Sequence, residues 1–349
     1  VGMREGMLMN IENPAGLTAL DSCKLFAEAS AFVKNERYRS DGSSSNAFTG
    51  NFSAFSLGGR IMRRWYMSAG VTPYSFVGYY FKSSQELEGS PGTFVTSTFS
   101  GTGGLSKAFL SQGFSLTKHL SVGMNLNFIF GNMTQNEIQS AMTVSREMSG
   151  RSFYADFGLQ YHRPIARETF LTVGAIYGYK QRISLKNTVT VTGSSTETPY
   201  NQKRVTQSLP QYIGIGSSLA HKKWTYALDY LFRQYGVLNS SDSRVKFRDS
   251  HELRLGVCYF PNGFSSSSYW KRMSYKAGVS VSTPYLRLKG QSGGAYRVSV
   301  GLGLPVLNGR INTAFYYDRL QLQGNALRRD IMGFTVTYTL SEKFYQVKL

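Results

Sequence analysis

The chain of 349 residues contains no run of about eighteen consecutive apolar residues, so a transmembrane helix is excluded. It has only two cysteines, Cys23 and Cys258, which lie far apart, and we expect two free thiols rather than a disulfide. Charged residues make up only 17% of the chain, and it has only 9 prolines. The mean hydropathy of −0.25 does not exclude a membrane protein, because a β-barrel needs apolar side chains only on its outer face.

Recognisable catalytic and metal-binding motifs are also lacking. The four histidines have neither metal-ligand spacing nor a neighbouring cysteine. No Gly-x-Ser-x-Gly turn stands between a strand and a helix, and the glycine-rich stretch at 101–104 does not open a helix as a phosphate-binding loop would. The N-terminus has no apolar signal core, which predicts a mature chain. We therefore expect no enzymatic activity, no catalytic residue, no metal and no cofactor.

Acidic residues are few relative to basic ones. There are 39 Lys and Arg against 20 Asp and Glu, which gives a formal net charge of +19. Such an excess raises nucleic acid as a possible partner, but the basic residues are dispersed through predicted turns and strand ends instead of forming one patch. We expect no nucleic-acid partner, and instead lipid phosphates and lipopolysaccharide as the anions that these residues meet.

The chain is rich in glycine and aromatic residues, with 36 Gly, 23 Tyr and 23 Phe, and they follow a period of two. Apolar residues occupy the even positions of the segment 120–130, and Ser121, Gly123, Asn125 and Asn127 lie between them. Strict alternation of this length is produced by a β-strand and not by an amphipathic helix. The pattern recurs at 153–161, 171–179, 224–232, 253–259, 296–304 and 332–340.

A soluble β-sandwich would alternate in the same way, but two features favour a barrel. Tyr161, Trp224, Tyr259, Tyr296 and Tyr338 lie near strand ends on the apolar face, as interfacial girdles require. The opposite face is rich in Gly, Ser, Thr and Asn, which suits an enclosed, wet interior. The sequence therefore predicts an all-β fold: a closed antiparallel transmembrane β-barrel in the outer membrane of a Gram-negative cell.

The lengths of the connections set the number and direction of the strands. Short connections alternate with longer ones, for which we expect loops at about 35–46, 82–92, 131–151, 181–207, 235–249 and 321–329. Short periplasmic turns and long outer loops are the usual asymmetry of such barrels. With both ends of the barrel on the periplasmic side, the strand number must be even, and we count about fourteen.

The pentapeptide Asn13-Pro14-Ala15-Gly16-Leu17 precedes the first predicted strand. This motif, followed at once by a barrel, resembles the FadL-type outer-membrane transport family. The stretches 101–131 and 308–344 resemble FadL-like proteins of the Bacteroidota. The resemblance covers essentially the whole chain.

The resemblance implies a barrel, residues 23–349, closed by a short N-terminal plug or hatch, residues 1–22, in which the hatch positions would be Asn13, Pro14, Ala15 and Gly16. It also implies a lateral opening where the third strand kinks inward. That strand starts near Trp65, and Pro73 interrupts it; proline has no N–H to donate to a neighbouring strand. Pro73 is our candidate for the opening, and the alternative is that Pro73 simply lies where the strand leaves the bilayer.

Arg233, Arg254 and Arg297 are predicted to face the lumen together with several carboxylates. One interpretation is a solvated ion-pair network that rigidifies the wall. The other is a site for the carboxylate of an amphiphile, because arginine binds carboxylates in a bidentate manner.

Two functions stay open. The first is passive uptake of a hydrophobic or amphiphilic small molecule with lateral release into the membrane, which predicts an apolar pocket beneath the hatch. The alternative is a non-transporting subunit of a larger outer-membrane complex, in secretion or barrel assembly, with other outer-membrane proteins as partners. It predicts a filled lumen and a flat outer face.

Overall fold

The computed structural model describes residues 1–40, 43–86, 89, 92–140, 142–193, 197–238, 245–261, 268–288, 290–325 and 327–343. The wall segments are β1 (Lys24–Ser40), β2 (Ser43–Met62), β3 (Trp65–Phe76), β4 (Tyr79–Glu86), β5 (Phe94–Ser115), β6 (Leu120–Gln139), β7 (Met142–Ala166), β8 (Thr169–Gly178), β9 (Gln181–Thr192), β10 (Glu197–Leu209), β11 (Tyr212–His221), β12 (Trp224–Arg233), β14 (Ser250–Tyr259), β15 (Ser274–Ser282), β17 (Gly293–Val306), β18 (Gly309–Leu322) and β19 (Arg328–Lys343). Outside the wall lie β13 (Val245–Phe247), paired with β16 (Leu286–Leu288), and the short helices η1 (Pro14–Ala19), η2 (Tyr235–Val237), α1 (Tyr269–Arg272) and η4 (Gln323–Asn325).

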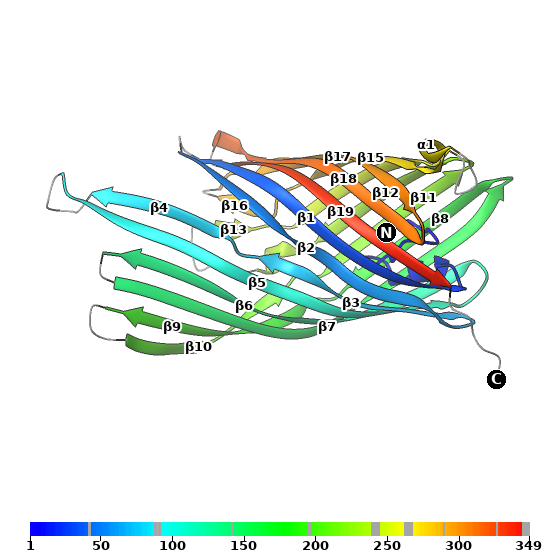
Figure 1. Cartoon of the computed structure of the whole chain (residues 1–349). Coiled ribbons are helices and arrows are strands. Elements are labelled where there is room, and N and C mark those ends of the chain that lie inside the picture. The colour runs from blue at the N-terminus through cyan, green and yellow to red at the C-terminus, as the bar shows by residue number, and fades with distance from the viewer. Residues whose placement is uncertain are drawn as a thin grey trace.

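The wall is a closed antiparallel barrel of 14 strands, as the sequence predicted. It closes where β1 pairs with β19, from Lys24 opposite Lys343 to Arg39 opposite Arg328. Three of the strands consist of two segments each, β3 with β4, β8 with β9, and β10 with β11. Figure 1 shows the strands running obliquely around the barrel, with the N-terminus at the end where β1 begins and β19 finishes. Among the described residues, no helix is long and apolar enough to cross a membrane.

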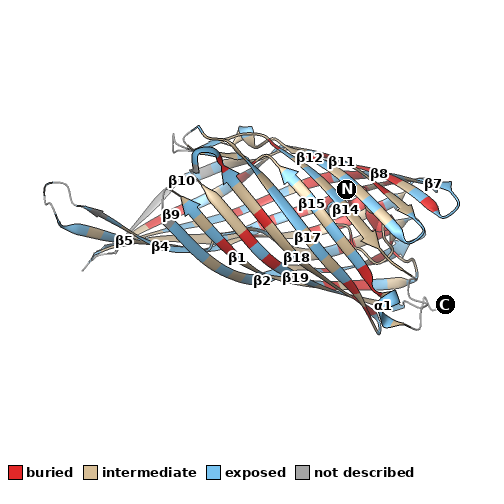
Figure 2. Cartoon of the chain, turned by 90° about the horizontal axis from the view of Figure 1, so that it is seen from above, coloured by how far each residue is buried: buried red, intermediate tan, exposed pale blue. Residues whose placement is uncertain are grey.

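The predicted alternation of faces is confirmed along β6. The inward-facing Asn127 is 0% exposed, whereas the next residue, Phe128, faces outward and is 43% exposed. Figure 2 shows buried and exposed positions alternating in this way along many strands. A water-soluble protein would hide the aromatic side chains and expose the amides. The reverse arrangement indicates that lipid surrounds the barrel.

The expected long loops at the far end are largely strand hairpins, so that prediction was wrong. The ladder between β6 and β7 continues to Gln139 opposite Met142, through residues assigned to a loop from the sequence. The ladder between β9 and β10 likewise runs from Leu209 to Glu197. Beyond the bilayer a strand needs no apolar outer face, so its sequence loses the alternation that reveals it within lipid. We call this end the loop end, and the opposite one the short-turn end.

The wall is interrupted between β2 and β3. Their ladder runs from Met62 opposite Trp65 only as far as Phe55 opposite Val71. Beyond Val71, the remainder of β3 and all of β4 pair with β5 alone in the described part of the chain, and the β3–β5 register shifts between Pro73 and Ser75. The two strands therefore separate towards the loop end, and we call this interruption the β2–β3 gap.

Candidate functional site

The N-terminal segment, residues 1–22, lies in the lumen at the short-turn end and is held there by Asn13. The Asn13 amide donates hydrogen bonds to the carbonyls of Val1 (2.9 Å) and Leu159 (3.2 Å), while its oxygen accepts one from Ala15 N–H (3.2 Å). The last bond caps η1, whose first residue, Pro14, has no N–H that needs a partner. The four predicted hatch residues, Asn13, Pro14, Ala15 and Gly16, are all buried.

Inward-facing glycines of the wall make room for the backbone of this segment. A β-carbon added at Gly123 would lie 2.4 Å from the nitrogen of Ala15, and one at Gly174 would lie 2.6 Å from the carbonyl oxygen of Val1. Both distances are too short for any other residue type, because ordinary contacts are about 3.5–4 Å. The high glycine content of the sequence therefore has a specific use here, which the sequence alone did not reveal.

Charged groups link the segment to strands far away in the chain. Glu5 pairs with Arg310 of β18 at 2.6 Å, and Glu12 pairs with Arg254 of β14 at 2.9 Å. The backbone N–H of Gly2 donates to Asp229 of β12 at 3.1 Å. The segment is thus fixed to three wall strands that form one side of the barrel, opposite to the strands that η1 contacts, β3, β5, β6 and β7.

The structure brings two of the three predicted lumen arginines together. Arg233 Nη1 lies 2.8 Å from one oxygen of Glu252, and Arg254 Nε lies 2.7 Å from the other. Arg297 is separate from them and pairs with Asp318 at 2.9 Å. All three guanidinium groups thus have a carboxylate of the protein within reach, which is what the ion-pair interpretation expects. Glu12, the additional partner of Arg254, was not foreseen because nothing local in the sequence links the two.

A cavity of about 740 Å³ lies in the lumen directly on the loop side of the N-terminal segment. Six tyrosines line it together with aliphatic side chains and the charged residues Glu12, Lys107, Asp156 and Arg233; the tyrosines are Tyr74, Tyr154, Tyr179, Tyr212, Tyr235 and Tyr285. Burial raises the pKa of the Tyr235 phenol above its ordinary value, so this group is a neutral hydrogen-bond donor. The cavity is amphipathic, whereas the sequence led us to expect an apolar pocket beneath the hatch.

One wall of the cavity coincides with the β2–β3 gap. Thr72, Tyr74 and Ser75, the residues that flank Pro73, all line it. The Thr72 hydroxyl donates to the carbonyl of Ser53 on β2 at 2.9 Å, just beyond the last ladder pair. Further along, the ring of Phe76 meets that of Phe32 of β1 edge to face, with centroids 5.5 Å apart. Pro73 thus lies two positions past the end of the ladder. Across the gap, the side chain of Thr72 connects β3 to β2, and the side chain of Phe76 connects β3 to β1.

Polar residues at the floor of the cavity are held by one another. Asp156 accepts hydrogen bonds from Asn125 (2.6 Å) and Asn127 (2.8 Å), and Asn125 also donates to the carbonyl of Ile11. Within the described ranges, no group of three or more His, Cys, Asp or Glu residues could hold a metal ion. Cys23 and Cys258 are free thiols, as expected.

A closed 14-stranded wall with an apolar exterior and a lumen filled at one end defines an outer-membrane β-barrel of the FadL type. A family model described as BamG matches residues 3–348, and the chain belongs to that family. No curated protein matches the chain.

Two solved structures with the same fold are transporters by their descriptions. The P. putida toluene transporter TodX superposes with a TM-score of 0.66 at 15% identity, over 97% of this chain and 94% of that one. The Ralstonia pickettii toluene transporter TbuX gives 0.62 at 14% identity, over 96% and 93%. A Pseudomonas aeruginosa FadL homologue gives 0.60 at 12% identity, over 96% and 93%. At these identities the likeness concerns the fold.

Proposed function

We propose that the protein takes up a hydrophobic or amphiphilic small molecule from outside the cell and releases it sideways into the membrane through the β2–β3 gap. The observation that carries this proposal is that the lumenal cavity is bounded by the residues at the edge of the gap, Thr72, Tyr74 and Ser75. The volume of the cavity suits a ligand of drug size.

The chemistry of the cavity lining favours a molecule with an aromatic or aliphatic body. Tyrosine rings offer apolar faces with a polar edge, and Leu209, Leu231 and Leu238 add aliphatic surface. TodX and TbuX are described as toluene transporters, and toluene has this character. Arg233 lies at the cavity and has Glu252 as its partner, so a carboxylate on the ligand would have to compete with that ion pair.

Under this proposal residues 1–22 act as the hatch, with Asn13, Pro14, Ala15 and Gly16 at its centre. Because the hatch is bonded to the wall on both sides of the lumen, an axial path to the periplasm would require several hydrogen bonds and ion pairs to the wall to break, among them the buried bonds of Ser121 to Thr18 and of Ser218 to Gly2 O. The lateral path requires the Phe32–Phe76 contact and the Thr72–Ser53 hydrogen bond to open. Pro73 favours this path because it cannot donate to β2.

A thiol block tests the lateral path. In a background with Cys23 and Cys258 replaced by serine, Thr72→Cys is reacted with a bulky maleimide, and entry of radiolabelled toluene and of radiolabelled oleate into proteoliposomes is measured. The matched control is Ser280→Cys on β15, which faces the lumen away from the cavity lining. We expect a strong loss of entry only at Thr72. Equal rates for the two labelled variants would refute the proposal.

The second candidate function, a subunit of a larger outer-membrane complex, is favoured by a different observation. The outward faces of β12, β14, β15 and β17 form an apolar hollow of about 530 Å³ lined by Leu228, Leu255, Val279 and Val298 among others. Such a surface can accept another membrane protein as well as lipid. Purification from native membrane in mild detergent distinguishes the two functions, because stoichiometric protein partners would contradict a lone transporter, and extracted hydrophobic ligand without partners would contradict the complex.

A further inference from the structure

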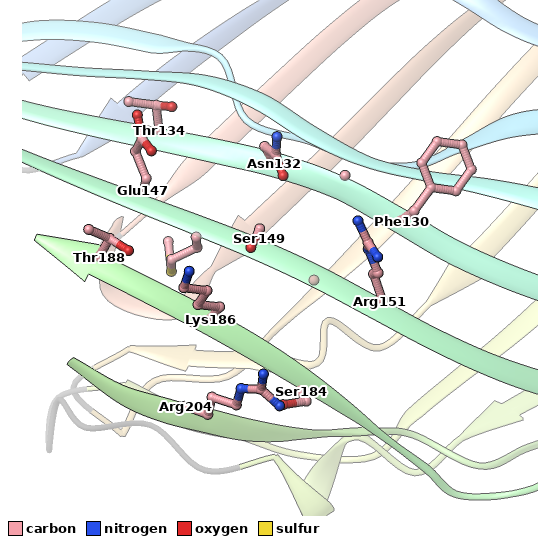
Figure 3. A pocket seen from close by; sticks show the side chains of 13 residues that line it. Phe130, Asn132, Thr134, Glu147, Ser149, Arg151, Ser184, Lys186, Thr188 and Arg204 are labelled. Atoms are coloured by element: carbon pink, nitrogen blue, oxygen red, sulfur yellow. The ribbon is translucent and has the colours of Figure 1, made fainter. Parts of the chain in front are cut away.

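The outer face of the wall carries a second, polar hollow, of about 870 Å³, over β6, β7, β9 and β10. Figure 3 shows Arg151, Lys186 and Arg204 on three neighbouring strands of this hollow, with Phe130 at one end. The burial pattern shows that these residues face away from the lumen: Ile183 and Leu185, which alternate with Lys186 on β9, pack in the interior cluster with Ile129 and Leu105. The hollow is therefore separate from the lumenal cavity.

The strand register places this hollow at the border of the apolar belt. On the outward face Phe128 lies opposite Phe153, and both are exposed as lipid-facing residues should be. The next outward pair is Phe130 opposite Arg151, and the following one is Asn132 opposite Ser149. One such step along a strand is about 6.6 Å, so the surface changes from aromatic to cationic within the depth of a lipid headgroup.

The charges in the hollow are unbalanced. Arg151, Lys186 and Arg204 contribute three positive charges against one carboxylate, Glu147, among the lining residues. Within the described ranges, no ion pair joins any of these three cations to a carboxylate, in contrast to the arginines of the lumen. The side chains of Ser149, Ser184 and Asn132 supply further hydrogen-bond donors at the same place.

We propose that this hollow binds the phosphate groups of an outer-leaflet glycolipid, lipopolysaccharide being the one of that chemistry in an outer membrane. Two guanidinium groups and an ammonium group line one concave surface, and charge-assisted hydrogen bonds to phosphate oxygens are the strongest that such groups form. Phe130 lies beside Arg151, and Phe128 and Phe153 lie directly below, where they contact the acyl chains of the same molecule. An acidic protein would form ion pairs with the cations but would not contact the aromatic residues, which lie within the bilayer.

The test compares full-length protein and the variant Arg151→Gln/Lys186→Gln/Arg204→Gln by native mass spectrometry with bis-phosphorylated lipid A. We expect binding to weaken by at least about tenfold. The control Arg63→Gln/Lys118→Gln/Arg167→Gln removes the same charge from exposed positions at the short-turn end and should bind as the parent does. Glu147→Gln removes the one opposing charge and should bind more tightly, a gain that a misfolded barrel cannot produce.

Four results would overturn the proposal: unchanged binding by the first triple variant, an equal loss in the control, equal affinity for lipid A without phosphates, or competition by inorganic phosphate at the concentration of the lipid. Extraction of the protein from native membrane can give a fifth result that would overturn the proposal. If the first triple variant lost a co-purifying protein yet kept its glycolipid, the hollow would be a protein interface.

Discussion

The contact between the N-terminal segment and the glycines of the wall leads to a sharp prediction about Gly123. A methyl group at this position would lie 2.4 Å from Ala15 N and 2.5 Å from the carbonyl carbon of Pro14. Both are backbone atoms and cannot turn aside as a side chain could. The variant Gly123→Ala therefore has to displace η1 by about 1 Å to restore an ordinary contact.

The displacement acts on a well-packed element. Ala15 and Leu17 of η1 are 0% exposed, and the Thr18 hydroxyl bonds to Ser121, the inward neighbour of Gly123 along β6. Overpacking of this kind costs about 1–3 kcal/mol. If the barrel itself is unaffected, the whole cost falls on the bound state of the segment, and its displaced population should rise roughly 5- to 150-fold.

The displaced population can be measured by thiol labelling. Cys23 and Cys258 are replaced by serine, Leu17→Cys is introduced as a reporter at the buried centre of η1, and its reaction rate with a maleimide is followed in proteoliposomes. The rate should rise by the factor just given in the Gly123→Ala variant. Heat-modifiable mobility on gels verifies that the barrel is assembled.

The matched control is Gly256→Ala on β14. Gly256 is also on the inward face, but a β-carbon there would meet nothing nearer than Ala277 O at 3.9 Å. We expect the labelling rate of the control to equal that of the parent. If Gly123→Ala also left the rate unchanged, the N-terminal segment would not be held against β6 as the structure has it, and the glycines would have no part in its position.

Three further predictions concern the Asn13 hydrogen bonds, the Glu252 ion pairs and the Phe32–Phe76 ring contact. Asn13→Ala removes the hydrogen bonds to Val1 O and Leu159 O and the cap on Ala15 N–H. At a cost of about 1–3 kcal/mol, the Leu17→Cys reporter should react roughly 5- to 150-fold faster; a rate equal to the parent's would show that these bonds do not hold the segment. Glu252→Gln deprives Arg233 and Arg254 of their common carboxylate. The free energy of unfolding should fall by about 1–3 kcal/mol, and the unfolding temperature in detergent should fall with it, whereas Glu168→Gln in an exposed turn should change neither. Equal unfolding temperatures for the two variants would contradict a structural role for the ion pairs. Phe76→Ala removes the ring contact across the β2–β3 gap and should speed toluene entry into proteoliposomes relative to Phe81→Ala, whose ring stacks on Phe99 of β5 and does not cross the gap. Slower or equal entry would argue against the gap as the exit.

The transmembrane wall was predictable because lipid imposes a simple rule on each strand separately. Side chains such as Phe128 must be apolar and those such as Asn127 need not be, and a period of two follows. The rule ends where the lipid ends, which is why the extension of β6 to Gln139 was taken for a loop. The Asn-Pro-Ala-Gly motif could also be recognised in the sequence because its structural role is local: Asn13 caps the helix that Pro14 begins.

The candidate site was predictable only in part. The lack of an N–H at Pro73 marked a weak point in strand pairing, but the length of the β2–β3 gap depends on the register of β2, which no local pattern gives. The lumen arginines could be assigned to a face by alternation. Their partners could not, because Glu12 and Arg254 are 242 residues apart and meet only when the barrel closes around the N-terminal segment.

The amino-acid sequence by itself determined that the chain crosses a membrane with strands, since the alternation of apolar and polar side chains is a property of each strand and its solvent. It also supplies the Asn13 cap and the Pro14 with which η1 begins. The tertiary structure alone decided what the barrel contains and where its wall is interrupted: the cavity, the gap beside Pro73 and the cationic hollow around Arg151 each combine residues from several strands. Closure of the barrel determines which residues of different strands lie at the same height along the barrel axis, and this depends on the register of the whole sheet.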